Sequence, residues 1–501
     1  MNNGRQAGIL LHPTSLPGPF GIGDIGPQAL RWLDFLAEAG QLVWQVLPLG
    51  PTGYADSPYQ CFSVFAGNPW LISPEDLAAE GLLAPEEAAD HPDFAEGAAD
   101  YGGTIPFKRR ILQTAYERFR GGAAPGLRGV WQSFRVAESH WLEDYALFIA
   151  LKRAHDDRPW WEWERNLALC RPQALKRARA ALAPAIDEAA FEQFLFLRQW
   201  DAVRMHAREK RIQIIGDAPL YAARDSAEVW MHKEYFSLDG DGQPTAAAGV
   251  PPDYFSSTGQ LWGNPLFRWD ALQEEDFRWW VERMRSVLRL CDVVRLDHFR
   301  GYQAYWEVPA GQPTAETGQW VPGPGIALFT AMQAALGGLP FIAEDLGVIT
   351  DDVTALRDQF HLPGMRVLQF AFGDDAHNPF LPHNYEPRTV VYTGTHDNDT
   401  TLGWYRSLPE YERDRVRRYL ACDGSDIAWD FIRLAWASVA ETAIAPFQDV
   451  LNLDSTGRMN HPGIATGNWI WRCRERDLNS ETGRRLRELT ALYGRAADGT
   501  D

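Results

Sequence analysis

Short apolar runs that end in polar residues recur along the chain and predict β-strands. There are eight of them, at residues 8–12, 42–48, 212–217, 293–298, 341–345, 365–370, 390–397 and 445–451. Apolar runs without alternation are typical of strands buried on both faces of a parallel sheet. Helical apolar spacing at residues 29–39, 191–210 and 277–290 predicts helices between strands. Eight strand–helix units predict one (β/α)8 barrel of the α/β class over residues 1–501.

Two connections are too long for a simple crossover and predict insertions. More than 160 residues separate the second and third strands, so we expect a mostly helical inserted subdomain over residues 51–190. A second insertion is expected over residues 220–290, with a Gly/Pro/Ser-rich lid loop at about 249–259. About 50 residues follow the last strand, which leaves no room for a separate C-terminal β-sandwich. The helical patterns of the first insertion lie at residues 105–120, 141–153 and 174–182.

The charge balance excludes two classes of partner. The chain has 48 Lys and Arg against 67 Asp and Glu, a net charge of −19. Such a chain repels phosphate backbones and anionic lipid surfaces, so we expect neither nucleic acid nor membrane as a partner. The stretch 85–100 holds six carboxylates and no Lys or Arg, which predicts a solvated surface loop.

The five cysteines are widely spaced and form no CxxC pair. That pattern is typical of a reduced, cytoplasmic protein without a disulfide framework or zinc cluster. The N-terminus shows no signal-peptide pattern, and no apolar run approaches the roughly 18 residues of a membrane helix. The sequence indicates no obligate protein partner. Tryptophan is abundant, with 21 residues, and could serve the core or could stack on sugar rings.

Candidate chemistry lies at the strand ends, because active groups of such barrels sit at the carboxyl ends of the strands. The residues there are His12, Asp217, Asp297, His298, Glu344, Asp345, His396 and Asp397. A single Asp is often only a turn former or helix cap. Carboxylates at four strand ends are harder to explain in that way, because massed carboxylates repel one another unless chemistry uses them.

Two chemistries fit these residues. Glycosyl transfer needs one carboxylate as nucleophile and one carboxylic acid as proton donor. Metal-assisted hydrolysis would use Asp and His as ligands, but adjacent residues of a strand point to opposite faces, and no HExxH motif is present. We therefore expect no metal and no other cofactor. A GxGxxG pattern at residues 21–26 lacks the strand–turn–helix context of a dinucleotide site.

Arg295 favours glycosyl transfer. It lies two residues before Asp297, so both side chains point to the same side of the strand. A cation at that place would keep Asp297 ionised and oriented as a nucleophile. A purely structural Arg–Asp ion pair is the alternative.

Several motifs together resemble the amylomaltases, the 4-α-glucanotransferases of the α-amylase clan (glycoside hydrolase family 77). The resemblance covers essentially the whole chain, in order. It is carried by the segments at residues 11–17, 21–26, 54–59, 159–161, 216–221, 260–264, 294–301, 343–347, 394–400, 458–460 and 467–469. It implies a (β/α)8 barrel that needs no cofactor.

The resemblance also implies roles for single residues. Asp297 would be the nucleophile, Glu344 the general acid and base, and Asp397 a ligand of the sugar hydroxyls in the donor site. Arg295 would orient the nucleophile. The other expected substrate-binding residues are Asp217, His298 and His396 at strand ends, Tyr54 and Tyr59 in the groove, and Gln260, Trp262 and Asn264 at the lid and acceptor side.

The implied activity is transfer of α-1,4-glucan segments from malto-oligosaccharides or amylose to a glucan or glucose acceptor. The transfer would pass through a covalent glucosyl-enzyme with retention of configuration. A retaining α-1,4-glucan hydrolase is the alternative within the same class. A metal-dependent hydrolase and a glucan-binding barrel without catalysis are alternatives from other classes.

Overall fold

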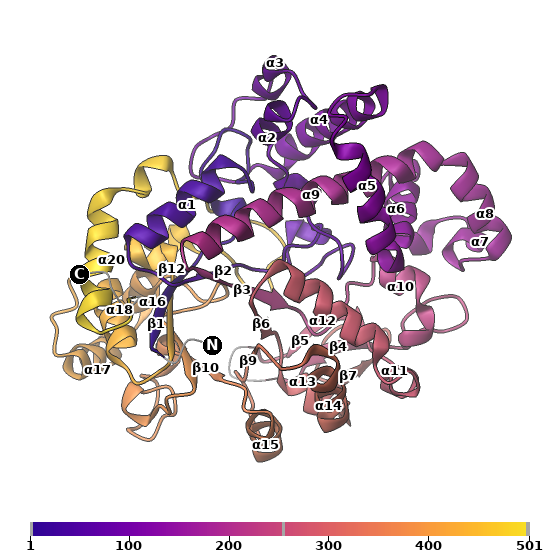
Figure 1. Cartoon of the computed structure of the whole chain (residues 1–501). Helices are drawn as coiled ribbons and strands as arrows, with labels where there is room; N and C mark the ends of the chain where they lie inside the picture. The colour runs from indigo at the N-terminus through magenta and orange to yellow at the C-terminus, as the bar shows by residue number, and fades with distance from the viewer. Residues whose placement is uncertain (1–3, 253–255, 497–501) are drawn as a thin grey trace.

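The computed structural model describes residues 4–252 and 256–496, and a closed parallel β-barrel forms its centre (Figure 1). Around the barrel the strands follow the order β1-β12-β11-β10-β9-β6-β3-β2. The strands are β1 (Gln6–Leu10), β2 (Val43–Gln45), β3 (Gln213–Ala218), β6 (Val293–Leu296), β9 (Phe341–Ala343), β10 (Gly364–Val367), β11 (Thr389–Tyr392) and β12 (Thr442–Pro446). Each predicted apolar run contributes one barrel strand, so the predicted (β/α)8 barrel is confirmed.

The barrel closes at β1, which packs tightly between β2 and β12. Gly8 of β1 lies against Val43 of β2, and a Cβ atom at Gly8 would lie 2.3 Å from the Cβ of Val43. Only glycine fits there. On the other side of β1, the buried Arg495 donates through Nη1 to the carbonyl of Gln6 at 3.0 Å. This contact ties the last described segment of the chain to the first strand.

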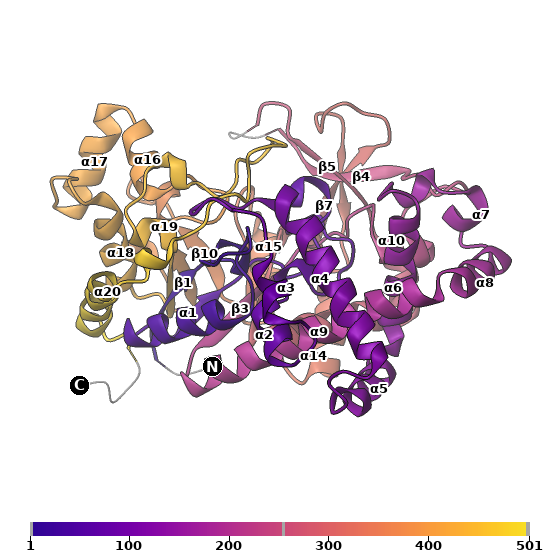
Figure 2. The same cartoon turned by 90° about the horizontal axis from the view of Figure 1, so that it is seen from above.

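Amphipathic helices surround the barrel (Figures 1 and 2). The α9 helix packs against β3, and the C-terminal α20 helix packs beside α1. Their buried faces carry large apolar side chains such as Trp32 and Trp200, both fully buried. These helices are α1 (Pro27–Glu38), α9 (Ala183–Glu209), α12 (Arg278–Leu290), α14 (Gly325–Leu336), α15 (Asp351–Gln359), α16 (Thr401–Ser407), α17 (Glu410–Leu420), α18 (Ile427–Ala437) and α20 (Ser480–Leu492).

The long connection from β2 to β3 is largely helical in the described structure. Its helices extend to one side of the barrel (Figure 2). Asp100 starts the longest helix before α9 by accepting a hydrogen bond from Gly103 N at 2.9 Å, and Gly122 ends it with φ of 105°. The helices are α2 (Pro74–Ala79), α3 (Pro85–Ala89), α4 (Tyr101–Gly121), α5 (Leu127–Ala137), α6 (Ser139–Ala154), α7 (Arg165–Ala168) and α8 (Pro172–Ala181). The division at residues 51–190 stays a prediction.

A small antiparallel sheet stands beside the barrel mouth and was not predicted. Its order is β5-β4-β7-β8. Strands β4 (Ala246–Val250) and β5 (Gln260–Pro265) follow β3, whereas β7 (Ala304–Pro309) and β8 (Gln319–Pro322) follow β6. Two separate barrel connections therefore build one sheet, and sequence patterns within either connection could not show that pairing. The second insertion, predicted over residues 220–290, stays a prediction as a unit.

Several predicted boundaries need correction. The run at 445–451 was predicted as a strand, but β12 ends at Pro446 and α19 (Phe447–Val450) follows. The buried Asp449 of α19 accepts hydrogen bonds from N and Oγ1 of Thr401. The acidic stretch at 85–100 begins with α3, whose Glu87 pairs with Arg118. Gln260 and Trp262, expected on a lid loop, lie in β5. Of that predicted lid, residues 253–255 lie outside the described residues.

After β12, the described chain up to residue 496 contains helices and loops but no strand. No helix among the described residues is both long and apolar enough to cross a bilayer.

Candidate active site

Three predicted carboxylates and one arginine meet at the carboxyl end of the barrel strands. Asp217 belongs to the end of β3, and Arg295 lies in β6 with Asp297 directly after it. Glu344 directly follows β9. These strands are neighbours in the barrel, so the residues come together although more than a hundred positions separate the first from the last. Asp397 follows β11, farther around the barrel.

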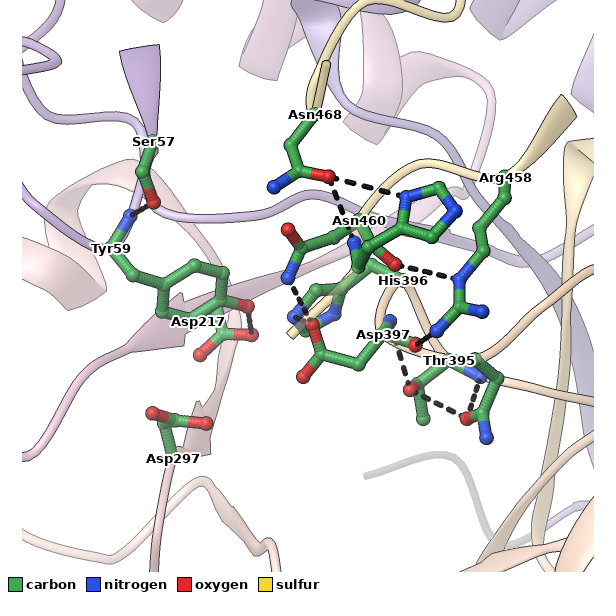
Figure 3. A network of polar contacts seen from close by, with 12 residues as sticks. Ser57, Tyr59, Asp217, Asp297, Thr395, His396, Asp397, Arg458, Asn460 and Asn468 are labelled. Carbon is green, nitrogen blue, oxygen red and sulfur yellow. Dashed lines mark hydrogen bonds and ion pairs between the residues drawn. The ribbon is translucent and has the colours of Figure 1, made fainter. Parts of the chain in front are cut away.

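Arg295 links two aspartates in the floor of the site. Its Nη1 donates to both oxygens of Asp217, at 3.0 and 2.8 Å, and to Oδ1 of Asp297 at 2.9 Å. Burial acts to lower the pKa of Arg295, but the two carboxylates outweigh it and hold that pKa well above its ordinary value. The hydroxyl of Tyr59 donates to Oδ2 of Asp217 at 2.9 Å (Figure 3). The arrangement keeps a permanent positive charge beside Asp297.

Glu344 lies in a different environment. Its Oε2 accepts a hydrogen bond from His298 N at 2.7 Å, and its Oε1 accepts one from Leu346 N at 3.1 Å. Burial raises the pKa of Glu344 to about 8, and the charge of Asp297 adds to the effect while Arg295 opposes it. Glu344 is therefore protonated near neutral pH. Two neighbouring carboxyl groups with such different surroundings suit the separate roles of proton donor and nucleophile.

Asp397 is held from a segment that follows the last barrel strand. Its Oδ1 accepts a hydrogen bond from Nδ2 of Asn460 at 2.6 Å, and its backbone carbonyl accepts one from Arg458 at 2.8 Å (Figure 3). His396 lies with Nε2 at 3.3 Å from the same Oδ1, and its ring stacks on Tyr59 with centroids 5.0 Å apart. Burial lowers the pKa of His396, so the imidazole is neutral at neutral pH. The Asp397 side chain stays 46% exposed and can reach a ligand.

The small sheet contributes one wall. The ring of Trp262 meets the ring of His298 edge-on, with centroids 4.9 Å apart, and its Nε1 donates to Oε1 of Gln260 at 3.2 Å. His298 has φ of 52°, a left-handed conformation that is uncommon for a residue with a side chain. Asn264 is buried and donates to the carbonyl of Ala222 at 2.9 Å. Asn264 therefore fixes the wall itself, whereas Trp262 faces the loop that carries Asp297 and His298.

Tyr54 differs from the other predicted residues. It lies on the same loop as Tyr59, in the turn Tyr54–Asp56, but it is 73% exposed. No contact within the described residues joins it to the carboxylates. Asp345, one of the candidate strand-end carboxylates, points elsewhere and pairs with Arg357 at 2.6 Å.

Asn460 and Arg458 bind Asp397, and the strand-end pattern gave neither of them a role. Both belong to the segment 458–460, which resembled the family but received no role. The sequence shows only that polar residues lie in a loop after the last strand. It does not indicate which carboxylate they contact. Within residues 4–252 and 256–496, no three His, Cys, Asp or Glu side chains are grouped so that they could hold a metal ion.

The mouth of this parallel barrel holds an aspartate bound to an arginine and a protonated glutamate. Such a pair of carboxyl groups is typical of carbohydrate-active barrels that work through two carboxyl groups. The sequence profile of the 4-α-glucanotransferases matches residues 11–478. The chain belongs to this family of glycosyltransferase-type enzymes, which transfer α-glucan segments.

Individual relatives agree over nearly the whole chain. A 4-α-glucanotransferase of Thermus thermophilus is 53% identical over 97% of this chain and 98% of its own length. One from Synechocystis is 50% identical over 99% of both chains. Among solved structures, amylomaltase from Streptococcus agalactiae in complex with acarbose matches with a TM-score of 0.95 and 38% identity, over 98% of this chain and 100% of that one. The predicted family, fold class and transfer activity are confirmed.

Proposed function

We propose that this chain transfers α-1,4-glucan segments by double displacement, with Asp297 as nucleophile and Glu344 as acid and base. In the first step a carboxylate oxygen of Asp297 bonds to C1 of the donor glucose, and the glycosidic oxygen leaves with the proton of Glu344. In the second step Glu344 takes a proton from an acceptor hydroxyl, which bonds to C1 and displaces Asp297. Two inversions retain the anomeric configuration.

The contrast between the two carboxyl groups is the observation that carries this assignment. Arg295 donates to Oδ1 of Asp297 at 2.9 Å and places a positive charge beside the oxygen atoms that would attack C1. Burial keeps a proton on Glu344 near neutral pH, which a general acid needs. Because Arg295 also binds Asp217, and Asp217 is held by Tyr59, the cation has a fixed position.

The donor and acceptor sides are assigned from the remaining contacts. Asp397, fixed by Asn460, would accept hydrogen bonds from sugar hydroxyls of the donor ring, and His396 would donate to the same ring. Trp262 and Gln260 would line the acceptor side, where an apolar wall keeps water from the covalent intermediate. The further predicted ligands are Asp217 and Tyr59 in the floor, His298 and Asn264 beside the small sheet, and Tyr54 on the exposed turn.

The proposed substrates are malto-oligosaccharides and amylose, with glucan or glucose as acceptor. The structural relative from Streptococcus agalactiae is a complex with acarbose, and we expect acarbose to bind this cleft as well. No cofactor, nucleic acid or obligate protein partner enters the proposal, and the proposed location is the cytoplasm. The segments 51–190 and 220–290 are proposed to act as inserted units that shape the cleft.

The test is incubation with maltotriose alone, with and without EDTA, followed by chain-length analysis. A ladder of longer maltodextrins together with glucose, unchanged by EDTA, is the expected result. Asp297→Asn should abolish the ladder and leave the fold intact, whereas Asp374→Asn, an exposed surface change, should leave it as it was.

Other outcomes separate the alternatives. Glucose and maltose without longer chains would indicate that water is the acceptor, as in a retaining hydrolase. Loss of activity with EDTA would indicate a metal-dependent hydrolase. Binding of glucan without turnover would indicate a barrel that only binds, and undiminished transfer by Asp297→Asn would contradict the proposed nucleophile.

A further inference from the structure

Arg300 joins the loop of the nucleophile to the loop of the acid. It lies three residues after Asp297, at the start of α13 (Arg300–Gln303). Its Nη1 donates to the carbonyl of Val348 at 2.8 Å and to Oγ1 of Thr350 at 3.1 Å. The guanidinium also stacks on Trp320 of β8, with Cζ 3.8 Å from the ring centroid. Three separate segments therefore meet at one side chain.

The segment that Arg300 holds begins with the proposed acid. Residues 344–350 run from Glu344 to both acceptors of the Arg300 hydrogen bonds. At the near end, Glu344 accepts from His298 N in the nucleophile loop and from Leu346 N in its own loop. The two loops are thus joined at the carboxyl group by His298 N and again several residues farther on by Arg300. Backbone bonds hold the segment at Glu344 itself, where Phe299 N also donates to the Glu344 carbonyl at 3.1 Å, and Arg300 holds its far end.

The electrostatics of Arg300 do not explain its burial. The residue is only 8% exposed, and its side-chain hydrogen bonds within the described residues go to a carbonyl and a hydroxyl rather than to a carboxylate. Burial lowers the pKa of Arg300, and the nearby Asp352 only partly offsets this. A buried arginine without an ion-pair partner costs stability. The hydrogen bonds to the acid loop and the stacking on Trp320 offset this cost.

We propose that Arg300 is a positioning residue that holds the 344–350 loop over Glu344, so that the acid stays aimed and shielded from water. Trp320 would act with it by keeping the guanidinium flat against the small sheet. The inference rests on the proposed role of Glu344 as general acid. Through Trp320 of β8, the small sheet would then support proton transfer, in addition to forming the wall that contains β5.

The direction of the pH effect distinguishes positioning from a direct charge effect. Glu344 is faced by Arg295 and Asp297 from β6 and by Asp345 from its own segment. A loosened loop would admit water and reduce the desolvation that raises the pKa of Glu344. The basic limb of the activity profile would then move to lower pH. Loss of a nearby positive charge alone would move the same limb to higher pH, because a cation favours the ionised acid.

The experiment compares Arg300→Ala, Arg300→Lys and Trp320→Ala with Arg285→Ala as a control. Arg285 is an exposed arginine of α12 that donates to the carbonyl of Ala335. Each variant is assayed on maltotriose across pH, and on α-maltosyl fluoride for release of fluoride in the first turnover. Fluoride leaves without protonation, so that reaction does not need the acid. Thermal melting checks that each variant is folded.

We expect Arg300→Ala to lower kcat on maltotriose about tenfold, a fraction of what general acid catalysis contributes, with KM changed less than about threefold. The basic limb should move to lower pH, and first-turnover fluoride release should change little. Arg300→Lys keeps the charge but not the stacking and forked reach, so it should resemble Arg300→Ala. Trp320→Ala changes a surface ring that is 36% exposed and should give a smaller effect of the same kind even if Arg300→Ala does not fold.

The proposal is overturned if fluoride release falls as much as maltotriose turnover, or if neither changes. An upward shift of the basic limb in Arg300→Ala with a wild-type profile in Arg300→Lys would assign Arg300 a charge effect instead. Glu344→Gln, measured in parallel, tests the proposed acid separately from the proposed role of Arg300. If that variant keeps full activity on maltotriose, the proposed acid is wrong, whatever the Arg300 variants do.

Discussion

Glu344 should cost the folded protein stability as pH rises, and replacing it with glutamine should remove that cost. Burial raises its pKa from 4.5 to about 8. Between those values the unfolded chain has released the proton while the folded chain still binds it. Stability therefore falls with rising pH across this window, and it is unaffected by this group below about pH 4.5.

The size of the effect follows from the same values. One pKa unit corresponds to about 1.4 kcal/mol, so the full rise is worth roughly 5 kcal/mol above pH 8, and about 3 kcal/mol at pH 7. The substitution Glu344→Gln also disturbs one of the two backbone hydrogen bonds, from His298 N or Leu346 N, at a cost of about 1 kcal/mol that does not depend on pH. The net expectation is a variant that is more stable than the parent at pH 7 and above.

The assay is denaturant unfolding of parent and variant at several pH values from 5 to 9, with Glu481→Gln as an exposed control. The stability difference between Glu344→Gln and the parent should grow by a few kcal/mol over that range, whereas the control should show no such trend. A difference that stays constant with pH would refute the raised pKa. It would also remove the reason for assigning the proton-donor role to this carboxyl group.

Further substitutions test the contacts around the two aspartates. Tyr59→Phe removes the hydroxyl that binds Asp217 and should lower kcat/KM about tenfold, the worth of one hydrogen bond to a charged group, with a slightly lower melting temperature. Asn460→Ala removes the amide that holds Asp397 and should raise KM for maltotriose in steady-state kinetics. Asn460→Asp should disturb the fold little, which thermal melting would show. Trp262→Ala opens the acceptor wall and should increase the share of donor lost to hydrolysis, measured as glucose and maltose formed without longer chains.

The sequence was informative about the barrel because burial on two faces leaves a local mark. Each barrel strand is a short apolar run, and its carboxyl end is marked by the polar residues that follow. Asp297 and Glu344 are among the strand-end residues marked in this way, since the barrel geometry brings the ends of all strands to one face, and the resemblance to the 4-α-glucanotransferases then singled them out. The small sheet left no such mark, because its strands come from two separate connections, and their pairing is set by the tertiary fold.

Sequence likewise placed Arg295 beside Asp297, since residues two apart share one face of a strand. It could not show that the same guanidinium also binds Asp217, which lies 78 positions away on the neighbouring strand. The link between Asn460 and Asp397 spans 63 positions and was equally out of reach. Both contacts depend on which strands and loops become neighbours in space.

The amino-acid sequence by itself therefore determined the strand pattern, the family and the identity of the carboxyl groups, because these depend on residue type and local spacing. Only the tertiary structure decided what each carboxyl group does. Burial and the charge of Asp297 raise the pKa of Glu344, which suits the proposed proton donor, and Arg295 donates to Asp297, which suits the proposed nucleophile. Solvation and charge at a site are set by everything packed around it, and that environment exists only in the folded chain.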